Sequence, residues 1–365
     1  MPHVTLQHKI SGSLSIRTAL IGFGFSGKTF HAPFLKNSPC FSVTHIVSRR
    51  HEDIKSAFSE NQPVILGQDE LDLVFQNPDI DLAIITTPSS MHYYTAKQAL
   101  LHGKHVVVEK PFVLDSAHGE ELIKIAENKN LVLSVYCNRR WDSDFLTIKS
   151  LLNENALGQI FSFKARYDRY RPSPQNHRWK ESTQPGAGIL WELGPHLIDQ
   201  AIMLFGTPHT VYADAFPQRP GARAIDYFDI RFTYPNGLRV CLSASTLVFS
   251  PCPKYEVHGF HGSFIKYGCD PQEQALINGT SPLDTHFGEE NIKDYGTLVQ
   301  MEEGRKTTRN YPSQRGSYET FFRQLAQSIQ GQATPPAKPK EALTTIKLIQ
   351  LCQESHYRKK ELSVS

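Results

Sequence analysis

The first third of the chain alternates short apolar runs with segments of helical pattern. Continuous apolar runs, typical of strands buried on both faces, occur at 17–24, 41–48, 81–88, 105–111 and 131–136. The segments between them are compatible with helices, and Gly103 stands where the C-cap of one helix is expected. Alternating strands and helices predict right-handed crossovers and a parallel sheet. We therefore expect a doubly wound α/β domain over residues 16–136.

The pattern changes after residue 137. A helix is predicted over 141–158, and residues 161–170 alternate apolar and polar positions, as a half-buried strand does. Three hairpins are expected, at 226–246, 254–268 and 296–312, the first around the turn Pro235-Asn236-Gly237. A Pro-rich linker at 334–340 precedes a terminal helix, for which packing back on the first domain is one option. Residues 137–365 thus predict an α/β domain with a large, open, mainly antiparallel sheet.

Composition and charge exclude several classes of protein. A length of 365 residues favours two domains, and a net charge of +3 lacks the basic excess of a nucleic-acid-binding protein. Six cysteines without a CxxC pair are typical of reduced thiols in a cytoplasmic chain and indicate neither disulfides nor a metal site. No apolar run is long enough to cross a membrane. Residues 1–15 lack the apolar region of a signal peptide and are expected to form a flexible tail.

A glycine motif, GFGFSG, follows the first predicted strand directly and precedes a helical pattern. In a dinucleotide site Gly22 permits the tight turn, Gly24 lets the backbone approach the pyrophosphate, and Gly27 lets helix and strand pack closely. The helix N-terminus then offers free N–H groups to the phosphates. The alternative is a plain strand–helix turn. The cofactor-binding candidates in this loop are Gly22, Phe23, Gly24, Phe25, Ser26 and Gly27.

The end of the second predicted strand carries no acidic residue. NAD-binding domains usually place Asp or Glu there, on the ribose hydroxyls, whereas this chain has Ser48, Arg49 and Arg50. A hydroxyl and two guanidinium groups suit a 2′-phosphate, because Arg forms bidentate, charge-assisted hydrogen bonds to phosphate oxygens. The alternative is that the arginines are solvated loop charges. The chemistry favours NADP as the cofactor over NAD.

Further polar residues follow two neighbouring strands and open a later helix. Lys110, in the tripeptide EKP, ends a parallel strand where open α/β sheets bind ligands, although an isolated lysine would more often be a surface residue. In WELGPHLIDQA, Pro195 suits a first helical position and places His196 in the first turn. His92 is not spaced from other histidines, cysteines or acids as metal ligands are, and by itself it is typical of a surface or packed residue. The cofactor-binding candidates here are Thr86, Thr87, Pro88, His92, Glu109 and Lys110.

Taken together, GFGFSG, TTPSSMH, EKP and ELGPHLID resemble the Gfo/Idh/MocA oxidoreductases over essentially the whole chain after residue 16. NRRWDSDF, at 138–145, is similar to a subgroup that includes NADP-dependent scyllo-inositol dehydrogenases. The resemblance implies a Rossmann NAD(P)-binding domain at 16–136 and a substrate-binding and oligomerisation domain at 137–365. It also implies a homodimer or homotetramer formed through the open sheet, a cis bond before Pro111, and Lys110 and His196 as catalytic residues between the domains.

The mechanism expected from this resemblance is alcohol oxidation. His196 would be the general base, and Lys110 would stabilise the developing alkoxide. The family usually has Asp four residues before the histidine, where this chain has Glu192. Glu192 is the third catalytic candidate, because its carboxylate would orient His196, raise its basicity and position another hydroxyl of the substrate.

Substrate contacts are expected from the loop after residue 167 and from the helix that carries His196. The alternative for the loop is an exposed segment with structural anchors. The stretch 139–144 would either line the cleft or, as we favour, form an inter-domain salt-bridge cluster. The substrate-binding candidates are Tyr167, Asn176, His177, Arg178, Trp179 and Asp199.

These expectations combine into an NADP-dependent oxidoreductase that acts on a secondary alcohol or ketone of a cyclic polyol or sugar. Inositol-type substrates come first because of the NRRWDSDF segment. An aldose 1-dehydrogenase of the same family is one alternative. The other is an NADP-binding sensor with weakened catalysis, for which Glu192 is the only favourable feature.

Overall fold

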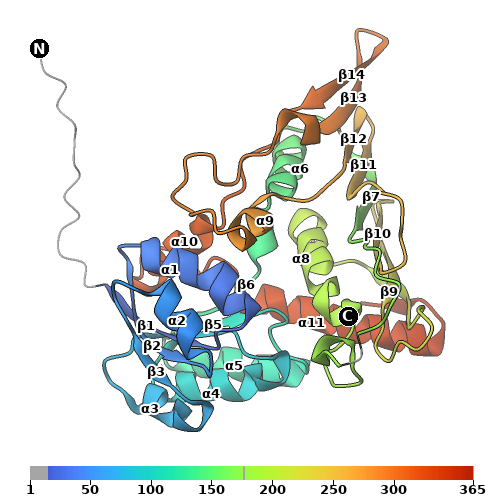
Figure 1. Ribbon diagram of the computed structural model, residues 1–365. Coiled ribbons are helices and arrows are strands. Elements are labelled where there is room, and N and C mark those ends of the chain that lie inside the picture. Colours follow the sequence, from blue (N-terminus) through green and yellow to red (C-terminus); the bar gives the residue numbers. More distant parts are fainter. Residues whose placement is uncertain (1–14, 176, 365) are drawn as a thin grey trace, which may run out of the picture.

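The computed structural model describes residues 15–175 and 177–364, so most of the predicted tail and the candidate Asn176 lie outside the described residues. Its first domain is built on a six-stranded parallel sheet with the order β3-β2-β1-β4-β5-β6 (Figure 1). The strands are β1 (Ile16–Ile21), β2 (Phe41–Val47), β3 (Val64–Leu66), β4 (Leu82–Ile85), β5 (His105–Glu109) and β6 (Leu133–Tyr136). The doubly wound domain is confirmed; the short β3 was not predicted.

Helices connect these strands and cover both faces of the sheet. They are η1 (Gly27–His31), α1 (Ala32–Asn37), α2 (His51–Ala57), η2 (Gln68–Glu70), α3 (Leu71–Gln76), η3 (Ser89–Met91), α4 (His92–Leu101) and α5 (Ser116–Asn128). Every residue of the central strand β4 is buried, which explains its continuous apolar sequence. The strand order reverses between β1 and β4, and such a switch point opens a crevice at the carboxyl ends of the strands. The glycine loop and the EKP tripeptide both lie at this edge.

The second domain is an α/β unit whose nine-stranded sheet has the order β14-β13-β12-β11-β7-β10-β9-β8-β15. Among the described strands of this second sheet, only the β7–β10 pair is parallel. The strands are β7 (Ile160–Arg166), β8 (Thr210–Phe216), β9 (Tyr227–Thr233), β10 (Arg239–Ser245), β11 (Tyr255–Gly259), β12 (Gly262–Lys266), β13 (Gly296–Glu302), β14 (Arg305–Tyr311) and β15 (Leu362–Ser363). The three predicted hairpins are β9–β10, β11–β12 and β13–β14; β8 and β15 were not predicted.

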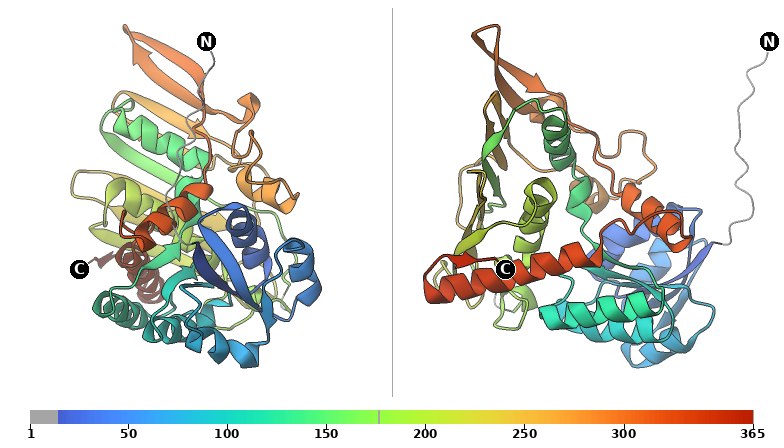
Figure 2. Two further views of the ribbon diagram at one scale, coloured as in Figure 1. Left: turned by 90° about the vertical axis from the view of Figure 1, so that its left-hand side faces the viewer. Right: turned by 180° about the vertical axis from the view of Figure 1, so that it is seen from behind.

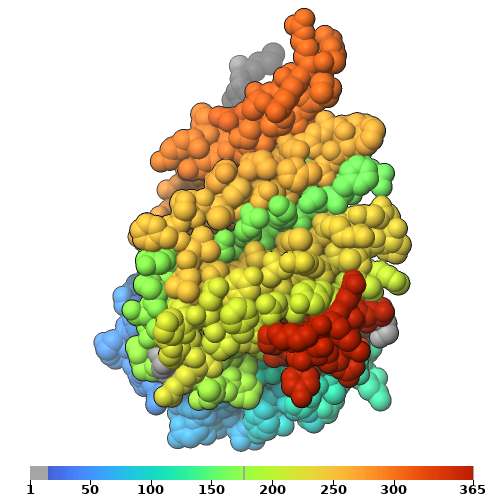
Figure 3. All heavy atoms as spheres, turned by 90° about the vertical axis from the view of Figure 1, so that its right-hand side faces the viewer, coloured from blue at the N-terminus to red at the C-terminus, as the bar shows by residue number. Residues whose placement is uncertain are grey.

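The helices of this domain are η4 (Asn138–Trp141), α6 (Ser143–Asn153), η5 (Trp179–Glu181), α7 (Ile189–Glu192), α8 (Gly194–Phe205), α9 (Gln272–Ile277), η6 (Ile292–Asp294), α10 (Glu319–Ile329) and α11 (Pro339–Arg358). They include some that pack on its sheet and others, such as α10 and α11, that pack on the first domain. Figures 1 and 2 show α6 and α8 on the inner face of the sheet. In Figure 3 the opposite face is exposed, with the strands crossing it as successive bands. None of the described helices is both long and apolar enough to cross a bilayer.

The terminal helix α11 runs along both domains (Figure 2). It packs against α8 and β8 of the second domain and against α5 and β6 of the first. Just before it, the Ser134 hydroxyl donates a 2.9 Å hydrogen bond to the backbone oxygen of Ala337. Lys347 pairs with Glu120 of α5 at 2.7 Å. The helix thereby fixes the position of one domain relative to the other, and with it the geometry of the cleft between them.

Candidate active site

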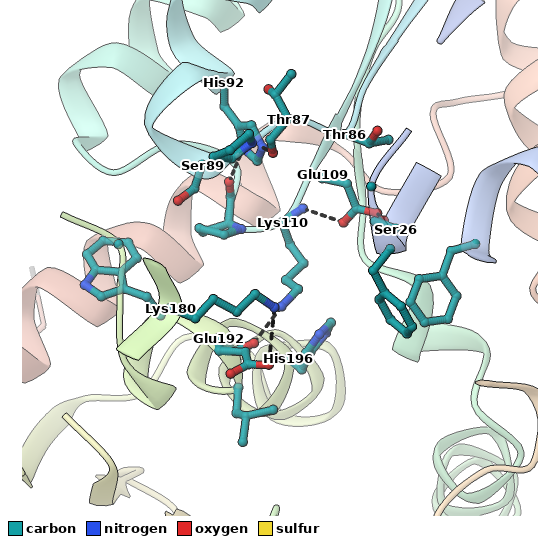
Figure 4. Close-up of a pocket in the computed structure, with 18 of the residues that line it drawn as sticks. Ser26, Thr86, Thr87, Ser89, His92, Glu109, Lys110, Lys180, Glu192 and His196 are labelled. Carbon is teal, nitrogen blue, oxygen red and sulfur yellow. Dashed lines mark hydrogen bonds and ion pairs between the residues drawn. The ribbon is translucent and has the colours of Figure 1, made fainter. Parts of the chain in front are cut away.

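A cavity of about 310 Å³ lies between the carboxyl ends of β1, β4 and β5 and the α7–α8 segment (Figure 4). Both domains contribute to its walls. Its lining includes Gly24, Phe25, Ser26, Phe30, Thr86, Thr87, Pro88, Ser89, His92, Glu109, Lys110, Arg139, Arg169, Trp179, Lys180, Trp191, Glu192, His196 and Glu273. It therefore unites the predicted glycine loop, TTP, EKP and the histidine segment.

The three glycines of the loop have distinct roles in the structure. Gly22 has a φ of +104°, and a Cβ there would lie 2.8 Å from the Thr86 hydroxyl oxygen. A Cβ at Gly27 would lie 2.5 Å from the backbone oxygen of Gly22. Nothing lies within 4 Å of the Cβ position of Gly24, which lines the cavity. Two glycines therefore close the turn, and the third leaves the backbone open to a phosphate group.

Glu109 links the glycine loop to the EKP tripeptide. Its buried carboxylate accepts hydrogen bonds from the Ser26 hydroxyl, from Nε2 of His31 at 2.9 Å and from the backbone N–H of Lys110 at 3.1 Å. Burial acts to raise the pKa of Glu109, but the hydrogen bond from His31 and its other partners lower it overall. The Glu109 carboxylate therefore connects the glycine loop to the EKP tripeptide.

The residues present fit a dinucleotide. Besides the open backbone at Gly24, the buried hydroxyl oxygens of Thr87 and Ser89 have no hydrogen-bond partner within the described part of the chain, although both residues line the cavity. Buried polar atoms are normally paired, so these hydroxyls are available to a bound polar ligand. The helix that begins in the glycine loop also directs its N-terminus toward this edge, where helices favour bound anions.

Two cofactor-binding candidates are placed differently from the prediction. The side chain of Phe23 is buried in the core, 6.3 Å from the ring of Phe58, so it is not part of the cavity wall. His92 lies on the wall, but its ring nitrogens face the backbone oxygens of Pro111 at 2.8 Å and Thr87 at 3.0 Å. Burial lowers the pKa of His92. The ring of His92 therefore connects the TTP segment to the EKP tripeptide, and its nitrogens are not available to a ligand.

Ser48, Arg49 and Arg50 lie outside this cavity, at the carboxyl end of β2. Arg49 and Arg50 line a separate, shallow hollow at the start of α2. The Ser48 hydroxyl accepts a 3.2 Å hydrogen bond from the backbone of Arg50. Lys28, which the sequence reasoning missed, pairs with Asp53 at 2.7 Å, and Arg50 approaches the same carboxylate at 3.5 Å. This corner is therefore rich in cations.

Lys110 extends from the end of β5 to the second domain. Its ammonium donates a 2.6 Å hydrogen bond to the backbone oxygen of Glu192, and the peptide bond before Pro111 is cis, as the resemblance implied. Burial, followed by the nearby charge of Lys180, lowers the pKa of Lys110 to about 8. The lysine is therefore held at the cavity, and its pKa lies close to neutral pH.

His196 lies in the first turn of α8, directly after Pro195. Its ring lines the cavity, and neither ring nitrogen has a hydrogen-bond partner among the described residues. Burial and the cations around it, Lys110 first, hold the pKa of His196 well below its ordinary value. The imidazole is therefore neutral at pH 7 and can accept a proton.

Among the described residues, no hydrogen bond or ion pair joins the Glu192 carboxylate to His196, so the predicted orienting role stays a prediction. Glu192 ends α7 and α8 begins at Gly194, close to the helix start expected from Pro195. The carboxylate instead lies 3.3 Å from Lys180 and 3.7 Å from Arg169. Burial opposes ionisation, yet the charges of these cations and of Lys110 hold the pKa of Glu192 at about 2. Glu192 is an ionised group of the cavity wall with partners of its own.

Only some of the substrate-binding candidates among the described residues line the cavity. Trp179 lines the cavity, whereas His177 and Arg178 are exposed and outside its lining. Tyr167 is buried behind the wall, with Arg139 and Lys254 about 5 Å from its ring centre, and its hydroxyl has no partner in 15–175 or 177–364. The loop thus contributes one predicted contact. It also brings in Lys180, which the sequence reasoning missed.

The structure places Asp199, a predicted substrate contact, outside the lining of the cavity. Both of its oxygens accept hydrogen bonds from the buried guanidinium of Arg140, at 2.8 and 2.6 Å. Arg140 also pairs with Glu341 of α11 at 2.6 Å. Asp199 is therefore part of a structural network at the domain junction.

Two other residues of the 139–144 stretch also form ion pairs. Arg139 pairs with Glu273 at 2.6 Å, and Asp144 with Lys254 at 2.6 Å. The stretch therefore forms a salt-bridge cluster, but these partners all belong to residues 137–365, so the cluster lies within the second domain and not between the domains as we favoured. Arg139 also lines the cavity, so the cluster forms part of its wall.

Comparison with known proteins identifies the family of this chain. Residues 16–137 match the model of the oxidoreductase family NAD-binding Rossmann fold (GFO_IDH_MocA), and residues 149–364 match the C-terminal alpha/beta domain of the same family. Scyllo-inositol 2-dehydrogenase (NADP(+)) IolW of Bacillus subtilis is 38% identical, over 95% of this chain and 96% of its own length. The uncharacterized oxidoreductase YdgJ of Escherichia coli is 39% identical, over 93% and 96%.

Solved structures show the same likeness. The oxidoreductase yvaA from Bacillus subtilis superposes with a TM-score of 0.92 at 38% identity, covering 96% of this chain and 99% of that one. The YPO2259 oxidoreductase from Yersinia pestis gives 0.90 at 37% identity, covering 96% and 97%. The chain therefore belongs to the Gfo/Idh/MocA oxidoreductase family and is an NAD(P)-dependent oxidoreductase that acts on CH–OH groups.

Proposed function

We propose that this enzyme uses NADP to interconvert a secondary alcohol and a ketone of a cyclic polyol or sugar, with inositol-type substrates first. One observation carries the proposal. The ammonium of Lys110 and the imidazole of His196 line the same cavity as the glycine loop, from opposite domains. An acid–base pair thereby faces the place where a nicotinamide would meet its substrate.

The cations at the end of β2 support NADP. The hydroxyl of Ser48 and the guanidinium groups of Arg49 and Arg50 stand where an NAD-binding domain usually has an acid. Lys28 adds a cation across Asp53. A 2′-phosphate is attracted by such a corner, and charge-assisted hydrogen bonds hold it. The relative IolW is named as an NADP(+) enzyme.

The dinucleotide supplies hydride transfer, and the protein supplies binding, orientation and proton transfer. Residues of the glycine loop and of the TTP and EKP segments would hold it, with its phosphates at Gly24 and its 2′-phosphate at Arg49 and Arg50. His196, neutral at pH 7, accepts the hydroxyl proton of the alcohol. Lys110 in its protonated form donates a hydrogen bond to the same oxygen and stabilises the developing negative charge.

The cavity suits a small polyol. Trp179 and Trp191 supply flat apolar surface for the C–H faces of a ring, while Arg169, Lys180 and Glu192 supply hydrogen-bonding groups. The similarity to a scyllo-inositol 2-dehydrogenase makes inositols the first substrates to test. The exposed outer face of the nine-stranded sheet supports the further proposal of a homodimer or homotetramer, which light scattering tests.

The test is formation of the reduced nicotinamide, followed by its absorbance, with NADP or NAD and a panel of inositols, aldoses and ketoses. We expect turnover of at least one inositol and a higher kcat/KM for NADP than for NAD. Faster turnover of an aldose at its anomeric carbon would favour the aldose dehydrogenase alternative. Cofactor binding without turnover of any polyol, in either direction, would refute the proposal.

A further inference from the structure

A second lysine approaches the cavity from the opposite side to Lys110. Lys180, on the short helix η5, places its ammonium 3.3 Å from a carboxylate oxygen of Glu192. The backbone oxygen of the same Glu192 accepts the hydrogen bond from Lys110 at 2.6 Å. Figure 4 shows the two lysines converging on Glu192 from different directions. Both lysines therefore belong to the polar wall next to His196.

A buried anchor fixes the loop that carries Lys180. The side chain of Arg219 is only 3% exposed and pairs with Glu181, the neighbour of Lys180, at 2.9 Å, and with Asp226 at 2.7 Å. It also donates to the backbone oxygen of Arg171 at 2.9 Å, near the start of the loop. At the other end, the backbone N–H of Gly188 donates to the oxygen of Lys180 at 2.8 Å. The position of Lys180 over the cavity is thus determined by the fold.

The contacts of Lys180 leave part of its hydrogen-bonding capacity free. An ammonium has three donors, and Glu192 is the one side-chain partner of Lys180 among the described residues. The Lys180 side chain is 49% exposed and lines the cavity, so its remaining donors can reach a ligand. Glu192 has two carboxylate oxygens, and a carboxylate only accepts. The pair therefore presents a donor and an acceptor side by side.

A hydroxyl group both donates and accepts hydrogen bonds, so this pair matches a hydroxyl better than a charged or apolar group. We propose that Lys180 is a substrate-binding residue that, together with Glu192, binds a second hydroxyl of the substrate beside the one oxidised at Lys110 and His196. The inference rests on the proposed function and extends it, since it makes a vicinal diol the preferred substrate unit. A simple secondary alcohol would leave the Lys180–Glu192 pair without its ligand.

The experiment compares steady-state kinetics of wild type, Lys180→Met, Lys180→Arg and Lys124→Met with NADP and the inositol panel. Lys124, exposed on α5, is the matched control and should not change KM. We expect Lys180→Met to raise the polyol KM by about tenfold to a hundredfold, because hydrogen bonds to charged groups contribute about 1.5–3 kcal/mol. Lys180→Arg should recover part of this loss, and the dissociation constant of NADP should stay the same in every variant.

Glu192→Gln separates direct binding from an effect through Glu192. If Lys180 binds substrate, Lys180→Met raises KM further in the Glu192→Gln background. If it only holds Glu192 in place, the double variant behaves like Glu192→Gln alone, and the inference is overturned. Polyol turnover with an unchanged KM in Lys180→Met overturns the inference while the proposed function stands. A wild-type enzyme that turns over no polyol refutes the proposed function, and the inference with it.

Discussion

The ammonium of Lys110 hydrogen-bonds the backbone oxygen of Glu192, at 2.6 Å, and this contact joins the two domains at the cavity. Because the acceptor is a backbone atom, the contact does not depend on the length of the side chain at position 192. The presence of Glu where the family usually has Asp therefore leaves the placement of Lys110 unchanged. The only feature that favoured a catalytically weakened sensor does not disturb the lysine.

The pH dependence of polyol oxidation should reflect two lowered pKa values. His196 must be neutral, and its pKa lies well below 6.5, so kcat/KM should stay constant as the pH falls through 6.5. Lys110 must be protonated, and its pKa is about 8, so kcat/KM should decline as the pH rises through about 8. The profile is measured at saturating NADP over the range in which the protein stays folded.

Lys110→Arg is the control for this assignment. A guanidinium stays charged throughout the range, so the decline near pH 8 should disappear whatever the remaining activity. A profile that falls at 6.5, or an upper limb that is the same in Lys110→Arg, would show that other groups control the reaction.

The NADP preference should depend on the arginines after β2. Replacing Arg49 and Arg50 together with Ala should raise the KM for NADP by about tenfold to a hundredfold, because charge-assisted hydrogen bonds to the 2′-phosphate are lost. The KM for NAD, which has no such phosphate, should change little. Lys55→Ala is the matched control, since Lys55 lies on α2 but pairs with Glu52 at 3.0 Å. Equal losses for the two cofactors would contradict the assignment.

The structural role given to Asp199 also has a consequence. Arg140→Met leaves the buried Asp199 without its partner and should lower the free energy of unfolding by about 3–5 kcal/mol. Asp199→Asn should cost less, because Arg140 keeps Glu341. Denaturant unfolding measures both, and neither variant should alter the polyol KM. A large rise in KM for Asp199→Asn with undiminished stability would restore Asp199 as a substrate contact.

Much of the fold could be predicted because its signals are local. The continuous apolar runs of β4 and β5 and the hairpin turn at Pro235-Asn236-Gly237 are recognisable from a few neighbouring residues. The same holds for Gly22, Gly24 and Gly27, since a tight turn between a strand and a helix restricts which residues it accepts. Strands β3 and β15 were missed because they are short, with three and two residues, and owe their place to pairing with distant partners.

The site residues that were misplaced depend on tertiary structure. The carboxylate of Glu192 pairs with Lys180 and approaches Arg169, and neither partner lies in the WELGPHLIDQA segment from which its role was predicted. Asp199 was assigned to substrate because its partner, Arg140, is 59 positions away. Lys180 was missed for the same reason, since only the folded loop brings it to Glu192. Its neighbour Trp179, already a candidate, was the one local signal.

The central claim is that Lys110 and His196 perform the proton transfer and charge stabilisation for the reaction. It is tested most directly by the single-turnover rate of NADPH formation from a polyol, with wild type, Lys110→Met and His196→Asn at saturating NADP. The account predicts that the single-turnover rate of each variant is lower than that of wild type by a factor of about 10²–10⁴, while its dissociation constant for NADP is unchanged. Single-turnover rates in both variants close to that of wild type would contradict it.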